Sequence, residues 1–262
     1  MRKAGKAKLI VGIKVGSATI VRREQIRGEK VVGPDRGFIN RLCSQVHSLI
    51  MLGYRPFVVT SGAVDSDTKK HRSRNLRASV GMNRLMNLYT KPLEELGHEP
   101  GMLLLTARYL DDSKVLKKTL NEALREGVVP IINANDTVDD DELKALGIYA
   151  DNDNLFFRVC ELVNAHIAII GFDQKGLLDK EKKVIHQVQL SEVPAVLDRL
   201  KGRGRRKKGI RTKVKVLAQL AALGVKAKLV PGREGNAFVR AVQDFFPEKG
   251  ETPKNFGTVF IP

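Results

Sequence analysis

The chain contains little cysteine, few aromatic residues and no tryptophan, and these shortages exclude several classes of protein. Only Cys43 and Cys160 occur among its 262 residues, too few for a disulfide scaffold or a cysteine-rich zinc site. Free thiols are typical of a reducing compartment, so we expect a cytoplasmic protein. Aromatic residues make up 5%, which leaves few platforms on which the bases of a single-stranded nucleic acid could stack.

Long hydrophobic runs are also missing. The first apolar stretch follows a basic N-terminus and is interrupted by Lys14, so it is too short for a signal peptide or a membrane span. Neither GxxxxGK[ST] nor HExxH occurs, and the five histidines are scattered without metal-ligand spacing. We therefore expect no membrane segment and no protein-bound metal site.

Acidic residues are scarce, with 29 Asp and Glu against 46 Lys and Arg, which gives a net charge of +17. Ten of the basic residues lie between Arg199 and Lys215, where no acidic residue occurs. Three glycines in this segment, Gly202, Gly204 and Gly209, predict a loop rather than a helix face. Such a basic loop suits nucleic acid and a polyphosphate pocket equally, and composition does not choose between them.

The sequence does have enough apolar residues, 42%, to bury a sizeable core. Short β-branched runs predict strands over residues 8–15, 56–60, 101–106, 128–133, 165–171, 227–230 and 258–261. Between them, helical spacing covers residues 38–52, 77–96, 113–126, 154–164, 191–200 and 212–223. This alternation predicts an α/β fold with a mainly parallel sheet covered on both faces, in one domain over residues 1–262.

Polar clusters follow several of these strands, and ligands of such sheets bind beyond the carboxyl ends of the strands. The clusters are Lys14 to Ser17, Thr60 to Ala63, Asn133 to Asp136, Asp151 to Asn154, and Phe172 to Gly176. Taken singly, each is explained as well by a turn or a helix cap. Their convergence at one edge of the sheet favours a binding site in which lysines and backbone N–H groups hold an anion.

Six segments, taken in order, resemble the glutamate 5-kinases of the amino acid kinase superfamily. They are KVGSATI (14–20), VVTSGAV (58–64), VPIINANDTV (129–138), ADNDNL (150–155), GFDQKGL (171–177) and GIRTK (209–213). The resemblance runs from about Leu9 to Pro262 and implies a three-layer αβα sandwich. It implies ATP-dependent phosphorylation of the γ-carboxylate of L-glutamate, the first step of proline synthesis, by a homo-oligomer. Magnesium would be held mainly by the ATP phosphates and water.

The resemblance also implies roles for individual residues. Lys14 and Lys213 would neutralise the transferred phosphoryl group, and Asp153 would hold both lysines. The positions that match glutamate-binding residues are Ser61, Gly62, Asp136 and Asn152. Those that match ATP-binding residues are Lys14, Gly16, Ser17, Phe172, Asp173, Lys207, Lys208, Gly209, Ile210, Arg211, Thr212 and Lys213. A γ-carboxylate is already ionised at pH 7, so no general base is expected.

The sequence departs from the family pattern at several places. The glycine-rich GTGGMxTK loop is here KKGIRTK, Phe172 replaces a threonine, VGM (80–82) replaces VGQ, and residues 65–76 are short and basic. We expect no C-terminal RNA-modification-type (PUA) domain. Two alternatives stay open: a divergent enzyme of this fold acting on another carboxylate or phosphate, and a catalytically weak regulatory or nucleic-acid-binding relative. The presence of Lys14, Asp153 and Lys213 together favours activity.

Overall fold

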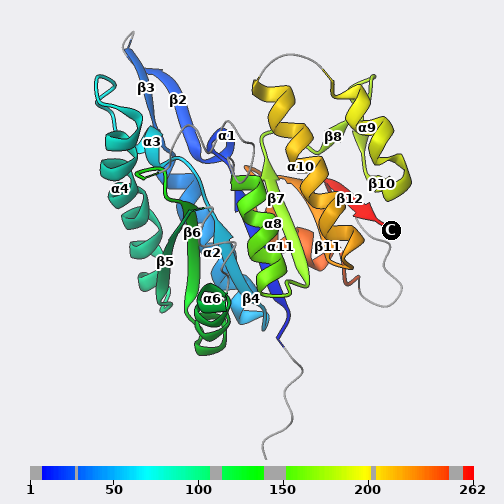
Figure 1. The fold of residues 1–262 in the computed structure, drawn as a ribbon, viewed down its shortest axis with the longest axis horizontal. Helices are drawn as coiled ribbons and strands as arrows, with labels where there is room; N and C mark the ends of the chain where they lie inside the picture. The colour runs from blue at the N-terminus through cyan, green and yellow to red at the C-terminus, as the bar shows by residue number, and fades with distance from the viewer. Residues whose placement is uncertain (1–7, 27–28, 107–113, 139–151, 202–204, 248–255) are drawn as a thin grey trace, which may run out of the picture.

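An eight-stranded sheet forms the centre of the molecule in a computed structural model that describes residues 8–26, 29–106, 114–138, 152–201, 205–247 and 256–262 (Figure 1). The strands run in the order β10-β12-β11-β7-β1-β4-β6-β5. They are β1 (Ile10–Val15), β4 (Arg55–Val59), β5 (Pro100–Leu105), β6 (Val129–Ala134), β7 (Ile167–Phe172), β10 (Gln187–Gln189), β11 (Lys226–Pro231) and β12 (Thr258–Ile261). From β11 to β5 every neighbouring pair is parallel, while β12 is antiparallel to β11. The prediction of a mainly parallel α/β sheet is confirmed.

Helices cover both faces of this sheet, which makes three layers. The longer ones are α2 (Arg36–Met51), α4 (Arg74–Glu95), α6 (Lys114–Glu126), α8 (Asn152–Leu162), α9 (Val193–Arg199), α10 (Arg205–Ala222) and α11 (Ala237–Gln243). Two short helices, α1 (Ser17–Ile20) and α3 (Ala63–Ser66), follow β1 and β4. In Figure 1, α6, α8 and α10 lie in front of the sheet, and α2 and α11 lie behind it.

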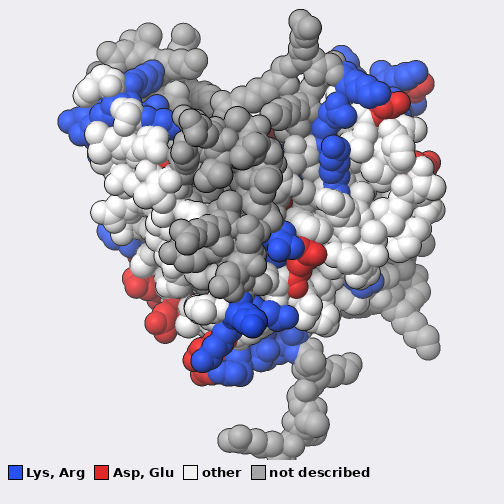
Figure 2. Space-filling view, in the orientation of Figure 1, with Lys and Arg blue, Asp and Glu red and all other residues white. Residues whose placement is uncertain are grey.

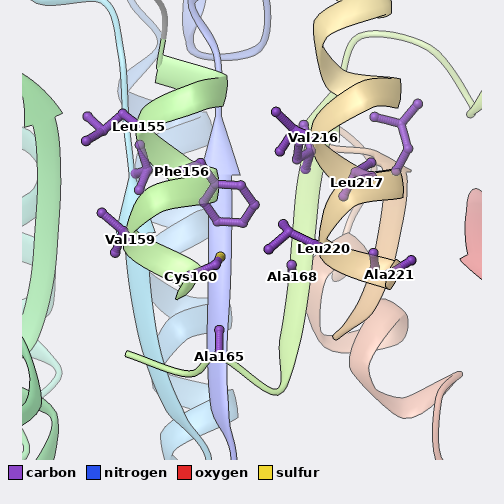
Figure 3. Close-up of a cluster of buried hydrophobic side chains, with 14 of the residues drawn as sticks. Leu155, Phe156, Val159, Cys160, Ala165, Ala168, Val216, Leu217, Leu220 and Ala221 are labelled. Carbon is purple, nitrogen blue, oxygen red and sulfur yellow. The ribbon is translucent and has the colours of Figure 1, made fainter. Parts of the chain in front are cut away.

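The strands alternate their side chains between two cores. On β7, Ala168 and Ile170 pack in the core beneath α8 and α10, whereas Ile167 and Ile169 belong to the core beneath α2 and α4. Figure 3 shows the first of these cores, where side chains of α8 face those of α10 across β7. Burial on both faces is the reason that the strands read as continuous apolar runs.

Two antiparallel hairpins were not predicted from the sequence. One pairs β2 (Val21–Ile26) with β3 (Glu29–Pro34), and the other pairs β8 (Leu177–Leu178) with β9 (Val184–Ile185). β2 is largely polar and β8 is two residues long, so neither has the apolar run by which a buried strand is recognised.

The prediction of a loop in the basic segment before Thr212 is wrong from Arg205 onward. α10 begins at Arg205 rather than near Thr212 and includes Gly209. Ile210, Val214 and Leu217 lie at helical spacing and are at most 8% exposed, so this end of the helix is held by a buried apolar stripe. A glycine inside a helix costs about 1 kcal/mol, which burial of these side chains outweighs.

The contact between α3 and α4 depends on Gly81. A Cβ atom at this position would lie 1.8 Å from the carbonyl oxygen of Ala63. Gly81→Ala must therefore separate α3 from α4, and we expect it to lower the free energy of unfolding by at least about 1–3 kcal/mol in urea denaturation. Gly209→Ala in α10 is the matched control, because its Cβ would meet nothing within 4 Å and should not destabilise the helix. Equal stability of the two variants would contradict this account.

Candidate active site

Lys14, Asp153 and Lys213 meet at one buried point, although they come from β1, α8 and α10. The Nζ atom of Lys213 donates to Oδ2 of Asp153 at 2.8 Å, and Lys14 forms an ion pair with Oδ1 of the same carboxylate. Lys14 is 3% exposed and Asp153 is 4% exposed. The structure therefore brings together the three residues for which a catalytic role was predicted, and that role itself stays a prediction.

Local sequence explains how these side chains converge. β1 turns Val11, Ile13 and Val15 toward α2, so Gly12 and Lys14 face α8. At Gly12 an added Cβ would lie 2.9 Å from the ring of Phe156, whose position over β1 is seen in Figure 3. Asp153 precedes Phe156 by three residues and lies on the same face of the helix. Packing of the Phe156 ring on Gly12 therefore places the Asp153 carboxylate next to Lys14.

Among the described residues, two lysines pair with the single carboxylate of Asp153. Burial raises the pKa of Asp153, but the ammonium groups of Lys14 and Lys213 outweigh it and hold the pKa below its usual value. Two cations thus share one carboxylate in a site with little access to water. Lysine ammonium groups held in place by a carboxylate are suited to contact the oxygens of a phosphate group.

A pair of serines lies at the ends of the neighbouring strands β1 and β4. The Oγ atoms of Ser17 and Ser61 are 2.7 Å apart. Before Ser17, Gly16 leaves room for the lysine, because a Cβ there would lie 3.2 Å from Nζ of Lys14. After Ser61, Gly62 has a φ of 96°, a left-handed conformation that favours glycine. All four residues were predicted site residues, and they gather at one strand edge.

Asn152 ties the start of α8 to the end of β6. Its Nδ2 donates to Oδ1 of Asn133 at 3.1 Å, and its Oδ1 accepts from the backbone N–H of Ala134 at 3.3 Å. Asn133 is 1% exposed and belongs to a predicted polar cluster, but sequence reasoning gave it no role. These two hydrogen bonds fix Asn152, the residue before Asp153. The side-chain amides of Asn152 and Asn133 therefore orient the first turn of α8.

Asp136, which follows β6, forms an ion pair with a residue that sequence reasoning missed. Nη2 of Arg74, in the first turn of α4, donates to Oδ1 of Asp136 at 2.8 Å. The two residues are 62 positions apart, and the sequence showed only that the segment before α4 is basic. Nothing in the pattern marks this arginine among its basic neighbours.

The other predicted nucleotide-binding residues lie at the end of β7 and along α10. Phe172 ends β7 and is 8% exposed, with its ring in the core, whereas Asp173 is exposed. Gly209, Ile210, Arg211 and Thr212 belong to α10, and the side chains of Lys207 and Lys208 lie outside the described residues. Figure 2 shows Lys and Arg side chains on this part of the surface, over α9 and α10.

Within the described ranges, no group of three His, Cys, Asp or Glu side chains is placed to bind a metal ion. Both oxygens of Asp153 already face lysines, so this carboxylate does not fit a role as a magnesium ligand. In the same ranges, no helix is both long and apolar enough to cross a membrane.

Comparisons with known proteins find relatives named glutamate 5-kinase and solved structures that share this fold. The glutamate 5-kinase of Geobacter sp. (strain M21) is 32% identical, over 98% of this chain and 68% of its own length. That of Syntrophus aciditrophicus is 28% identical over 95% of this chain, which spans 64% of that relative. Among solved structures, UMP kinase from Ureaplasma parvum matches with a TM-score of 0.60 at 15% identity, over 97% of both chains.

The carbamate kinase of Giardia lamblia matches with a TM-score of 0.64 at 11% identity, over 97% of this chain and 99% of its own. At such identities these structures show the fold alone. The model of the "Amino acid kinase family" matches residues 8–230, which run from β1 to the last but one residue of β11 and include Lys14, Asp153 and Lys213. The chain therefore belongs to the amino acid kinase family.

Proposed function

We propose that this protein transfers the γ-phosphoryl group of ATP to the γ-carboxylate of L-glutamate and forms L-glutamyl 5-phosphate, the first step of proline biosynthesis. The observation that carries the proposal is the buried cluster of Lys14, Asp153 and Lys213 beside Ser17 and Ser61. Relatives named glutamate 5-kinase, at about 30% identity along most of the chain, support the choice of substrate.

The chemistry needs charge neutralisation more than proton transfer. Both reactants are anions, so the enzyme must bring them together in line and stabilise the charge on the transferred group. The ionised γ-carboxylate attacks without a base, which agrees with a cluster built from lysines and one carboxylate. Asp153 orients both ammonium groups, and Lys14 and Lys213 then contact the phosphoryl oxygens. Magnesium would arrive with ATP, held by phosphates and water.

The proposed glutamate site lies between the ends of β4 and β6 and the start of α8. Ser61 and the backbone at Gly62 bind the substrate from one side. Asp136 offers a carboxylate for the α-ammonium group, and Asn152 offers both a donor and an acceptor. A free amino acid suits this set, because its ammonium group pairs with Asp136.

N-Acetylglutamate is therefore expected to be a poor substrate. Acetylation removes the charge that pairs with Asp136 and adds bulk at the same point, so kcat/KM should fall by about 10²-fold or more relative to glutamate. A hydroxamate assay, which traps acyl phosphates, measures both substrates in parallel, with aspartate as a control for chain length. Equal turnover of glutamate and N-acetylglutamate would contradict the proposal.

A further inference from the structure

The first turn of α4 contacts the proposed glutamate site at two places. Arg74 donates to Asp136, and Nδ2 of Asn75 donates to the backbone oxygen of Thr137 at 3.1 Å. Ser73 caps the helix by accepting from the backbone N–H of Leu76. The start of a 22-residue helix is thus fixed against the segment that follows β6.

A second set of bonds fixes the same turn to α3, which begins two residues after Ser61. Nη2 of Arg77 donates to the backbone oxygens of Val64 and Asp67 at 3.0 and 3.2 Å. The carboxylate of Asp67, whose side chain is fully buried, pairs with Arg72 at 3.2 Å. Arg74 is therefore held at a set position relative to Ser61 as well as to Asp136.

One hydrogen bond joins Arg74 to Asp136, and both side chains have further donors or acceptors with which a ligand could interact. A guanidinium group carries several N–H donors in a planar fork, and a carboxylate has two oxygens. Among the described residues, Asp136 is the only acidic side chain within ion-pair distance of Arg74. The Arg74 side chain is 46% exposed and that of Asp136 is 16% exposed, so the pair is open on the arginine side.

We propose that Arg74 binds the α-carboxylate of the substrate while Asp136 binds its ammonium group, so that the pair recognises the zwitterionic head of a free amino acid. The inference rests on the proposed function. A fixed cation and anion side by side match the two opposite charges on an amino acid α-carbon, and the guanidinium fork fits a carboxylate. The same pair disfavours a substrate that carries only one of the two charges.

The test compares glutamate with 4-aminobutanoate, which keeps the ammonium group and the reactive carboxylate but lacks the α-carboxylate. Arg74→Ala should raise the KM for glutamate by about 10- to 100-fold, the usual effect of losing a hydrogen bond to a charged group, with little change in kcat. The inhibition constant of 4-aminobutanoate against glutamate should stay unchanged. Arg74→Lys should restore part of the affinity. Lys70→Ala, which removes the same charge from an exposed position nearby, should leave the KM for glutamate as it is.

The outcomes separate this inference from the function on which it rests. A parallel weakening of glutamate and 4-aminobutanoate in Arg74→Ala would mean that Arg74 only positions Asp136, and would overturn the proposal. A lower KM for glutamate would overturn it too, because Arg74 would then compete with the ammonium group. An unchanged KM in an active variant would overturn the role of Arg74 alone. Failure of the unmodified protein to phosphorylate glutamate would overturn the proposed function and this inference together.

Discussion

Lys213→Ala is expected to lower the kcat for glutamate phosphorylation by about 10²-fold or more, and Lys14→Ala should do the same. Stabilisation of transition-state charge by a fixed donor is worth about 3–4 kcal/mol in a site closed to water. The KM values should change less than kcat, because the lysines act where charge develops during transfer. Steady-state kinetics in the hydroxamate assay give both constants.

Lys215→Ala is the matched control, since Lys215 lies on the same helix two residues further on and is exposed. Asp153→Asn should also lower kcat, because a neutral amide no longer balances the two ammonium groups, and circular dichroism checks that the variant remains folded. Folded variants at all three positions with near-normal kcat would disprove the mechanism.

Asp244→Ala is expected to lower the free energy of unfolding by about 3–5 kcal/mol, the usual cost of breaking a buried ion pair. Lys228 on β11 is 4% exposed and forms an ion pair with Asp244, which directly follows α11. The same carboxylate accepts from the backbone N–H of Phe256 at 3.3 Å. The variant therefore leaves a buried ammonium group without its counter-charge.

The pH dependence identifies the cause of this loss. Burial lowers the pKa of Lys228, and Asp244 offsets only part of the effect. Without Asp244 the pKa falls further, so the folded variant loses its proton at a pH where the unfolded chain still holds one. Its stability should rise with pH through that window, and the difference from the unmodified protein should narrow.

Urea denaturation across this pH range measures both effects. Asp198→Ala is the control, because Asp198 pairs with Lys201 at 2.7 Å on the surface, where the change should be barely detectable. Combining Lys228→Met with Asp244→Leu should recover much of the stability. If Asp244→Ala lowered the free energy of unfolding equally at every pH, lost packing rather than the unpaired charge of Lys228 would be the cause.

Much of the architecture could be predicted because both faces of the sheet are buried. β1 and β7 are almost entirely apolar over six residues, and such runs between helical patterns require a covered parallel sheet. That topology in turn brings Lys14, Ser61 and Asn133 to one edge, since parallel strands end on the same side. The close packing of α8 on β1 also has a signal in the sequence, because Gly12 on β1 leaves room for the ring of Phe156.

What sequence reasoning missed depends on contacts between distant residues. Three glycines pointed to a loop before α10, but burial of Val214 and Leu217 against the sheet is a tertiary effect that local propensity does not contain. Arg74 is one of several arginines in a basic stretch, and only the packing of α4 on α3 selects it for Asp136. Pattern alone could not distinguish it from Arg72, which pairs with Asp67 instead.

The basic start of α10 has a consequence for evolution and engineering of this protein. Its first four residues, Arg205 to Lys208, are all cationic, and no acidic residue occurs in the first turn. Positive charge at the N-terminal end of a helix opposes the helix dipole, so this composition weakens the helix that carries Lys213. Replacing these residues with acidic ones would make the helix more stable and would repel a polyphosphate from the same end. Stability and the proposed binding of ATP therefore select for opposite charges here, so that under the proposed function variants chosen for thermal resistance alone should tend to bind the phosphate donor more weakly.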